Sequence, residues 1–160
     1  MDQQAKKSVL RQLTYGLYAV TAEHDGERGV FTANWLSQAS FDPPLVMLSV
    51  ERESSTLPLI RASGAFGVCP LASDQRELAG ALGRPKARAG DKFAGLGLAV
   101  LVGVEGPPAL ADALGYLNCR VQSEVSAGDS VVFLAEVVGA RLLRDGDPLE
   151  MRVAGFRHAG

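Results

Sequence analysis

Short apolar segments separated by turn-forming residues dominate the pattern of hydrophobic and polar positions along this chain. These segments are rich in β-branched and aromatic residues and are bounded by glycine, proline or aspartate, a pattern typical of β-strands. The nearly continuous apolar run at 45–50 predicts a strand that is buried on both faces. The segments predicted as strands are 17–22, 30–37, 45–50, 66–71, 98–105, 115–125, 130–143 and, as a further candidate, 149–156.

Only a few segments have the character of helices. Residues 2–13 predict a polar helix with a buried apolar stripe formed by Val9, Leu10 and Leu13. The other predicted helices are 57–63 and 74–82. Many strands with few helices predict a mainly β fold, with a mostly antiparallel sheet closed into a small barrel. A doubly wound parallel sheet fits less well, because the strands and helices do not alternate regularly.

The chain has 160 residues and predicts a single domain over 1–160, because no linker, repeat or shift in composition divides it. A formal net charge of −2 without a basic stripe argues against binding to nucleic acid. No apolar stretch is long enough to span a bilayer, and the N-terminus lacks the apolar region of a secretory signal. Cys69 and Cys119 are far apart and predict buried free thiols, so we expect a cytoplasmic protein.

Histidine and cysteine are scarce, with two of each. A catalytic triad needs a positioned imidazole, whereas His24 lies in a predicted turn and His158 near the C-terminus, where we expect both to be surface residues. A zinc site usually needs three or four nitrogen or sulfur ligands, so no metal site is predicted. Glycine-rich phosphate loops of the P-loop and Rossmann types are also absent. The sequence therefore favours chemistry carried by a bound cofactor, with no catalytic side chain assigned.

Two polar segments are candidates for holding a cofactor. Ser54, Ser55 and Thr56 combine hydroxyls with the free backbone N–H groups of a helix start, which suits either a phosphate or a plain helix cap. Residues 32–40 follow a strand and contain an amide, hydroxyls and the indole of Trp35. That combination suits either a planar heteroaromatic ligand or a polar loop that the tryptophan anchors in the core.

These segments belong to a longer ordered series of motifs. It opens with GVFTANWLSQASFDPPLVMLSV at 29–50. The series resembles the flavin reductase-like, FMN-binding split-barrel family, and it covers nearly the whole chain. The further motifs, in chain order, are Ser55-Thr56-Leu57 with Ile60, Ser63-Gly64, Phe66, Leu71 with Asp74-Gln75, Asp91-Lys92-Phe93, Cys119-Arg120-Val121, and Gly128-Asp129 before Glu136-Val137.

The resemblance implies a split β-barrel that forms a homodimer, with FMN near the subunit interface. It implies that Cys69 is a thiol packed beside the flavin ring rather than a redox group. The implied cofactor-binding residues are Thr32, Ala33, Asn34, Trp35, Leu36 and Ser37 with Ser49 and Glu51 for the ring and ribityl chain, Ser54, Ser55 and Thr56 for the phosphate, Cys69, Pro70 and Leu71 for a second backbone stretch, and Lys92 and Phe93 for a closing loop.

The implied activity is that of an NAD(P)H:FMN oxidoreductase, in which hydride passes from NADH or NADPH to FMN and the reduced flavin serves a partner monooxygenase or another acceptor. Lys92 or backbone N–H groups are expected to stabilise the charge of the reduced flavin. One position departs from the resemblance. The family's reductases often carry a histidine associated with the nicotinamide where this chain has Ser130. This leaves open a flavoredoxin-like electron-transfer protein reduced by a protein partner, or a non-catalytic flavin-binding protein.

A loop with Arg84, Lys86 and Arg88 is the most basic segment of the chain. Such a loop suits either a solvated surface or the mouth of a pocket that attracts an anionic dinucleotide.

Overall fold

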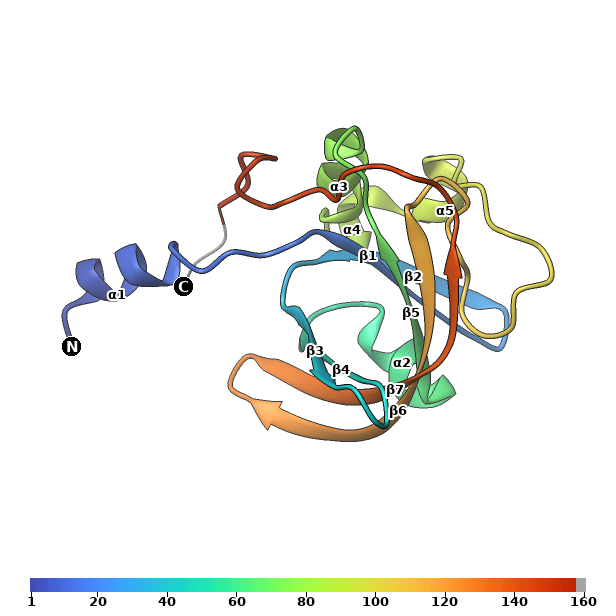
Figure 1. The fold of residues 1–160 in the computed structure, drawn as a ribbon, viewed down its shortest axis with the longest axis horizontal. Helices are drawn as coiled ribbons and strands as arrows, with labels where there is room; N and C mark the ends of the chain where they lie inside the picture. The colour runs from blue at the N-terminus through green and yellow to red at the C-terminus, as the bar shows by residue number, and fades with distance from the viewer. Residues whose placement is uncertain (158–160) are drawn as a thin grey trace.

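The fold is a curled antiparallel sheet with the strand order β2-β1-β5-β6-β7-β4-β3 (Figure 1). The computed structural model describes residues 1–157, so His158 lies outside the described residues. The predicted mainly β fold with a few short helices is confirmed. The strands are β1 (Tyr18–His24), β2 (Glu27–Ala33), β3 (Leu36–Ser40), β4 (Leu45–Glu51), β5 (Ala65–Pro70), β6 (Gly115–Ala127) and β7 (Ser130–Leu142). The helices are α1 (Gln3–Leu10), α2 (Leu57–Ser63), α3 (Arg76–Leu82), α4 (Lys86–Ala89) and α5 (Lys92–Gly95).

The two edge strands of this sheet, β2 and β3, follow each other in the chain. β2 ends at Ala33 and β3 begins at Leu36, so only residues 34 and 35 connect the two edges. Three successive Cα–Cα steps span at most about 11 Å. The sheet must therefore curl until its edges approach each other, which gives the barrel its split.

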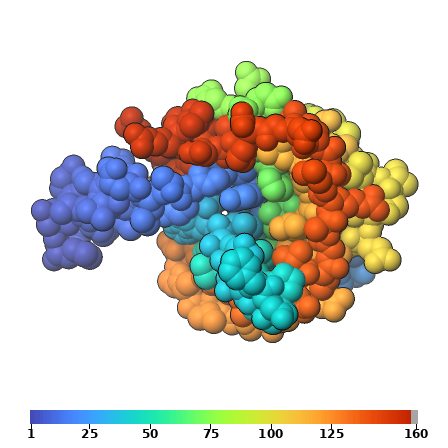
Figure 2. Space-filling view, in the orientation of Figure 1, coloured from blue at the N-terminus to red at the C-terminus, as the bar shows by residue number. Residues whose placement is uncertain are grey.

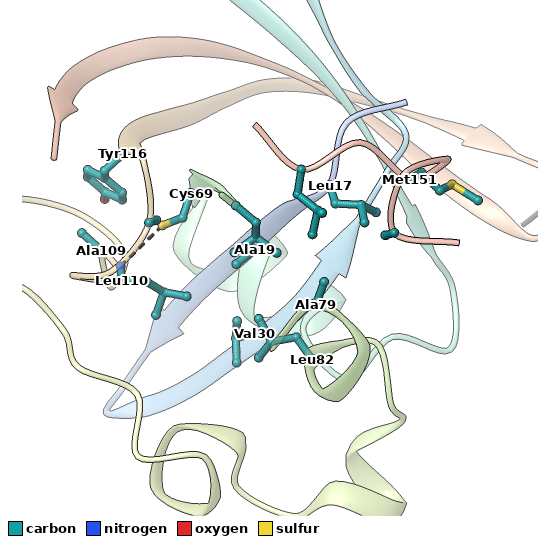
Figure 3. Close-up of a cluster of buried hydrophobic side chains, with 14 of the residues drawn as sticks. Leu17, Ala19, Val30, Cys69, Ala79, Leu82, Ala109, Leu110, Tyr116 and Met151 are labelled. Atoms are coloured by element: carbon teal, nitrogen blue, oxygen red, sulfur yellow. Dashed lines mark hydrogen bonds between the residues drawn. The ribbon is translucent and has the colours of Figure 1, made fainter. Parts of the chain in front are cut away.

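Hydrophobic side chains form two buried clusters on opposite faces of the central strands. The barrel cluster lies inside the curl and includes Val20, Leu48 and Phe133. The cover cluster lies under α3 and the C-terminal segment and includes Leu82, whose neighbours are drawn in Figure 3. On β1, Ala19 joins the cover cluster while its neighbour Val20 joins the barrel cluster, as the two-residue period of a strand requires.

The prediction that 45–50 is buried on both faces is wrong. Val46, Leu48 and Val50 are buried in the barrel cluster, whereas Met47 keeps 44% of its surface exposed. β4 pairs with β3 and β7 in the sheet, and the described residues place no further layer over Met47. An apolar run therefore does not by itself establish that both faces of a strand are covered.

The predicted burial of the N-terminal stripe is also wrong. α1 forms, with the Asp2 carboxylate accepting from the backbone N–H groups of Gln4 and Ala5. It stands away from the barrel (Figures 1 and 2), and Val9 is 66% exposed. Helical spacing places these apolar residues on one face of the helix, but none of the three is buried in the described part of the chain. None of the helices in that range has the length and apolar character needed to cross a membrane.

Two predicted strands, 98–105 and 149–156, are irregular apart from isolated bridges such as Val100 with Leu110. The segment after 98–105 is fixed to the barrel by side chains instead. The Thr21 hydroxyl donates to the carbonyl of Pro108 over 2.7 Å, and the Tyr116 hydroxyl donates to that of Pro107 over 2.7 Å. Residues 107 and 108 lie in no strand, and their carbonyls accept from side-chain hydroxyls instead of from a sheet ladder.

Thr21→Val tests this anchoring. Valine keeps the shape but removes the hydroxyl, which leaves the buried Pro108 carbonyl without its donor. We expect a loss of about 1–3 kcal/mol in the free energy of unfolding, measured by urea denaturation. Thr14→Val, at an exposed threonine, is the control and should change stability by less than about 0.5 kcal/mol. Equal effects of the two substitutions would contradict the anchoring role.

Candidate functional site

A cavity of about 540 Å³ lies between the β1–β2 turn, the start of α2 and the segment that carries α4 and α5. It brings together three residues that the sequence assigned to a cofactor site, Ser55, Lys92 and Phe93. The remaining lining residues are Gly26, Glu27, Arg28, Gly29, Val30, Lys86, Gly90, Asp91, Ala94, Leu98 and Val100.

Lys92 is a buried cation in the wall of this cavity, with 9% of its surface exposed. Its ammonium donates to the backbone carbonyl of Val30 over 3.1 Å and to that of Leu82. Burial lowers the pKa of Lys92 from its usual 10.5, and no described carboxylate pairs with it. An ammonium has three donors, so two carbonyls leave it able to bind an anion as well. It lines the same cavity as Ser55, a residue that the sequence assigned to the phosphate.

The positions of Lys92 and Phe93 are fixed by the start of α5. The Asp91 carboxylate accepts from the backbone N–H of Phe93 over 2.9 Å and from that of Ala94 over 3.4 Å. This is the capping arrangement expected for an aspartate before a short helix. The Phe93 ring lies under the guanidinium of Arg28, at 5.9 Å from its centroid. The cavity wall therefore combines a flat aromatic and cationic surface with the Lys92 ammonium.

The three hydroxyl residues of segment 54–56 have different surroundings. Ser55 is exposed and lines the cavity. Ser54 accepts from the backbone N–H of Thr56 over 3.3 Å. Thr56 is buried beneath Gly29, where a Cβ on residue 29 would lie 2.7 Å from the Thr56 Oγ1. Glycine at 29 therefore lets the start of α2 approach β2, and Ser55 is the member that faces the cavity.

The side chains of residues 32–34 are directed into the protein. The Thr32 hydroxyl donates to the carbonyl of Ala79 over 2.6 Å, and Ala33 is buried. The Asn34 amide lies 3.3 Å from the Met151 sulfur, in hydrogen-bonding geometry. These contacts fix the end of β2 and the start of the connection to β3, while Thr32 and Asn34 stay half-buried.

A second group of predicted residues lies on β3 and β4, after the connection formed by residues 34 and 35. The backbone N–H of Ser49 donates to the carbonyl of Trp35 over 2.9 Å. Leu36 pairs with Leu48, and Ser37 with Met47, across β3 and β4. Ser37 and Glu51 are exposed, and Ser49 is half-buried. These residues do not line the 540 Å³ cavity, so the predicted site consists of a cavity and an adjoining open surface.

Ser130 lies beside this second group, because it pairs with Glu51 in the β4–β7 ladder. The turn is held in place by Arg52, whose backbone N–H donates to the Asp129 carbonyl over 2.9 Å. Ser130 is only 3% exposed, and its hydroxyl donates to the Asp129 carboxylate over 3.0 Å. The residue that departs from the resemblance is therefore near the predicted flavin residues but engaged within its own turn.

Cys69 (Figure 3) and Leu71 are fully buried in the cover cluster, and Pro70 between them is half-buried. The backbone N–H of Leu110 donates to the Cys69 sulfur over 3.5 Å, and burial raises the pKa of this thiol to about 11. Cys119 is buried as well, with its pKa raised to about 12. The prediction that both cysteines are buried free thiols is confirmed. Neither of them lines the cavity.

Several lining residues had no signal in the sequence. Glu27 and Arg28 begin β2, directly after a turn with positive φ at Asp25 and Gly26, and Leu98 and Val100 were expected in a strand. The predicted basic loop forms the short helix α4 at Lys86–Ala89. Lys86 lines the cavity and pairs with Glu27 over 2.8 Å, whereas Arg84 and Arg88 do not line it. In the β1–β2 hairpin, the lining residues that also belong to a family motif are Gly29 and Val30, the first two residues of the motif at 29–50.

The match to a family defines the class of protein. The model of the flavin reductase like domain matches residues 10–160, and the chain belongs to this family. It is 34% identical over 158 residues to the reductase component of a 4-nitrophenol 4-monooxygenase/4-nitrocatechol 2-monooxygenase of Rhodococcus opacus, covering 99% of this chain and 82% of that protein. It is also 34% identical over 155 residues to the NADH:riboflavin 5'-phosphate oxidoreductase of Streptomyces pristinaespiralis, covering 96% and 84%.

Some relatives are much longer. The chain is 34% identical to a high molecular weight rubredoxin of Moorella thermoacetica but spans 61% of its length. It spans 23% of a putative diflavin flavoprotein of Synechocystis.

Solved structures share the fold. Nitrilotriacetate monooxygenase component B from Mycobacterium thermoresistibile superposes with a TM-score of 0.82 at 30% identity, covering 93% of this chain and 82% of that one. The styrene monooxygenase flavin reductase of Pseudomonas putida S12 gives a TM-score of 0.77 at 27% identity, covering 90% and 89%. The predicted membership of the family and the predicted fold class are confirmed.

The buried ammonium of Lys92 predicts a pH-dependent affinity for a phosphate-bearing flavin. An anion bound beside Lys92 favours its protonated form, so FMN affinity should fall as pH rises through the lowered pKa, before pH 10.5 is reached. A charge-assisted contact is worth about 1.5–3 kcal/mol, which corresponds to a loss of about 10-fold or more. Fluorescence titration from pH 7 to 10 would measure this loss.

Riboflavin, which has no phosphate, is the control ligand and should show no comparable decline. Lys92→Met should bind FMN weakly at every pH and remove the difference between the two ligands. Parallel pH profiles of FMN and riboflavin in the unaltered protein would contradict the assignment.

Proposed function

We propose that this chain is an NAD(P)H-dependent flavin reductase that binds FMN. The observation that carries the proposal is the convergence of Ser55 with Lys92 and Phe93, from two separate parts of the chain, on one cavity. The names of similar proteins support it, because they include an NADH:riboflavin 5'-phosphate oxidoreductase and reductase components of monooxygenases.

In this proposal the chain binds and orients, and bound FMN supplies the capacity to accept a hydride from NAD(P)H. Lys92, Arg28 and the Ser55 hydroxyl surround the phosphate. The main chain of 32–35 and the strand ends at Ser37, Ser49 and Glu51 flank the ring. Fixed donors of this kind need no reorganisation during the reaction, so positioning contributes much of the rate.

The other proposed contacts act through the backbone or through packing. They are Thr32, Ala33, Asn34, Trp35, Leu36, Ser54, Thr56, Cys69, Pro70 and Leu71. We further propose that the whole of 1–160 forms one domain, that it works in the cytoplasm, where buried thiols stay reduced, and that a monooxygenase or another protein accepts its electrons.

Stopped-flow mixing tests the activity. Protein loaded with FMN should lose its absorbance near 450 nm when it is mixed with NADH or NADPH under anaerobic conditions. Free FMN at the same concentration is the control and should react far more slowly. A bound flavin that stays oxidised with both nucleotides would overturn the reductase proposal and favour a flavoredoxin-like carrier, consistent with Ser130.

We propose that the chain is a homodimer that associates through the outer face of β4, β7 and β6. On this face Met47 pairs with Leu134, and Val132 lies between Ser49 and Val125 in the register. Directly paired residues share one side of a sheet, so these apolar side chains form a continuous patch. Val125 is 63% exposed, and an exposed apolar patch of this kind typically marks an interface. Because Ser49 lies at its edge, the interface would border the flavin.

Substituting both Met47 and Val125 by glutamate tests the dimer. Two charges on the patch should convert a dimer into a monomer in sedimentation velocity and weaken FMN binding by about 10-fold or more, since a buried charge at the interface costs several kcal/mol. Val102→Glu introduces a charge at an exposed valine outside the sheet and should change neither property. A double variant that remains dimeric would contradict the proposed interface.

A further inference from the structure

A second cavity, of about 340 Å³, lies where residues 10–15 meet residues 150–157. These N-terminal and C-terminal segments lie side by side in Figure 2, in blue and red. None of the residues that line this terminal cavity lines the 540 Å³ cavity, and none was assigned to FMN. Its volume lies at the lower end of the range of about 300–1,000 Å³ that is usual for small-molecule sites, so it suits a ligand with one ring rather than a dinucleotide.

Backbone hydrogen bonds hold the two segments together. The N–H of Met151 donates to the carbonyl of Tyr15 over 2.9 Å, and Gly16 forms an isolated β-bridge with Glu150. The N–H of Phe156 donates to the carbonyl of Met151 over 3.1 Å, which turns the C-terminal segment back on itself. The positions of Tyr15, Met151 and Phe156 in the cavity wall are therefore set by the backbone.

We infer that the terminal cavity binds a small aromatic carboxylate. The cavity offers guanidinium groups for the carboxylate and aromatic side chains for the ring. This site lies outside the proposed flavin site, so the binding of the carboxylate does not depend on the proposed function. Only the expected effect of the carboxylate on the flavin rests on that function.

The charge of the terminal cavity is opposite in sign to that of the whole chain. Three arginines, Arg11, Arg152 and Arg157, line it against one acid, Glu150, whereas the chain has a formal net charge of −2. None of the ion pairs among residues 1–157 includes one of these arginines. A guanidinium presents a planar fork of donors that matches a carboxylate with two parallel hydrogen bonds. The cavity therefore holds unpaired cations of the kind that carboxylates prefer.

The aromatic side chains supply the second part of the site. Tyr15 and Phe156 line the cavity and are half-buried against the cover cluster. The Phe156 ring is held by Arg76, whose guanidinium carbon lies 5.6 Å from the ring centroid and whose Nε donates to the Ala154 carbonyl over 2.6 Å. Aromatic rings gain from offset and edge-to-face contacts with one another, beyond the burial of apolar area. An aromatic ligand therefore fits this wall better than an aliphatic ring of similar size.

Neither part is sufficient alone. Arg11 and Arg152 are exposed, and an exposed pair of one guanidinium and one carboxylate contributes little to affinity. A ring without a charge would likewise leave the arginines unpaired. We therefore expect affinity only for ligands that combine an aromatic ring with a carboxylate.

Met151 connects the terminal cavity to the proposed flavin site. It lines the cavity at the edge of the cover cluster (Figure 3), and its sulfur accepts from the Asn34 amide over 3.3 Å. Asn34 lies in the connection between β2 and β3, which the proposed function places beside the flavin ring. A carboxylate bound beside Met151 brings a negative charge close to this connection. Occupation of the cavity should therefore change the absorption spectrum of bound FMN.

Three probes of similar size test the binding on the full chain by calorimetry. Benzoate has both the ring and the charge, benzamide keeps the ring without the charge, and cyclohexanecarboxylate keeps the charge without the aromatic ring. Benzoate should bind at least about 5-fold more tightly than either of the other two, because only benzoate pairs with the arginines and contacts the aromatic wall.

Two pairs of variants locate the site. Arg11→Gln combined with Arg152→Gln removes two lining cations, and Arg84→Gln combined with Arg141→Gln removes two exposed cations outside both cavities. The first protein should lose at least about 5-fold in benzoate affinity relative to the second, with the FMN affinity unchanged.

The second pair concerns the ring. Phe156→Leu removes an aromatic wall, and Phe41→Leu alters an exposed phenylalanine elsewhere. Phe156→Leu should abolish the preference for benzoate over cyclohexanecarboxylate, which Phe41→Leu should keep.

Three results would overturn the inference. The first is equal affinity of the unaltered protein for benzoate and benzamide. The second is a benzoate constant of the Arg11 and Arg152 double variant within twofold of that of its control. The third is displacement of benzoate by ADP, because the cavity would then belong to a nucleotide.

The effect on the flavin is read separately. Saturating benzoate should shift the absorbance of bound FMN near 450 nm in the unaltered protein and not in the Arg11 and Arg152 double variant. An unchanged spectrum would overturn the connection through Met151. A protein that binds benzoate but no FMN would instead contradict the proposed function and leave the carboxylate site standing.

Discussion

The hydrogen bonds from the Lys92 ammonium to the carbonyls of Val30 and Leu82 determine the shape of the site. β2 is an edge strand, so backbone groups on its outer side have no ladder partner and need donors from elsewhere. Lys92 supplies one such donor and at the same time ties the end of α3 to β2. Burying this cation costs free energy, which the two carbonyls offset only in part. A binding site for an anion beside it would offset the rest, so structural role and binding role reinforce each other.

A second constraint acts on the opposite side of β2. Gly29 leaves no Cβ between the strand and Thr56, so the start of α2 can approach closely. Thr32 ties the same strand to α3 through the carbonyl of Ala79. β2 is therefore fixed to α2, α3 and α5 by three different contacts, each involving backbone or a small residue. An edge strand held in this way can serve as the rigid side of a binding site without a neighbouring strand.

The sequence predicts well whatever depends on local chemistry. The turn at Gly128 and the strands on either side of it follow from residue type and two-residue alternation, and the start of α2 follows from Pro58, although Thr56 makes no side-chain capping bond there. The sequence predicts the burial of a side chain poorly, because burial depends on which other part of the protein covers it. Val9 and Met47 are apolar and in regular elements, yet the described chain supplies no partner to bury them.

The same division applies to the site. The order of the motifs along the chain identified Ser55, Lys92 and Phe93, because each belongs to a motif that resembles the family. It could not identify Arg28 or Val100, since their role arises only when the hairpin folds over α5. It also could not tell that the Thr32 and Asn34 side chains are occupied by Ala79 and Met151. Residue type indicates what a side chain can bind, and only packing decides whether it is available.

The chain has few histidines and cysteines, and the ionisable residues of the 540 Å³ cavity are engaged in contacts within the protein. Every ionisable side chain that lines the cavity already has a partner: Glu27 with Lys86, Arg28 with Glu23, Asp91 with the start of α5, and Lys92 with two carbonyls. These contacts hold Arg28, Lys86 and Lys92 where their positive charges border the cavity. Cations placed in this way are suited to binding and orienting an anionic ligand. A cavity built in this way needs a ligand that brings its own reactivity, and a flavin is such a ligand.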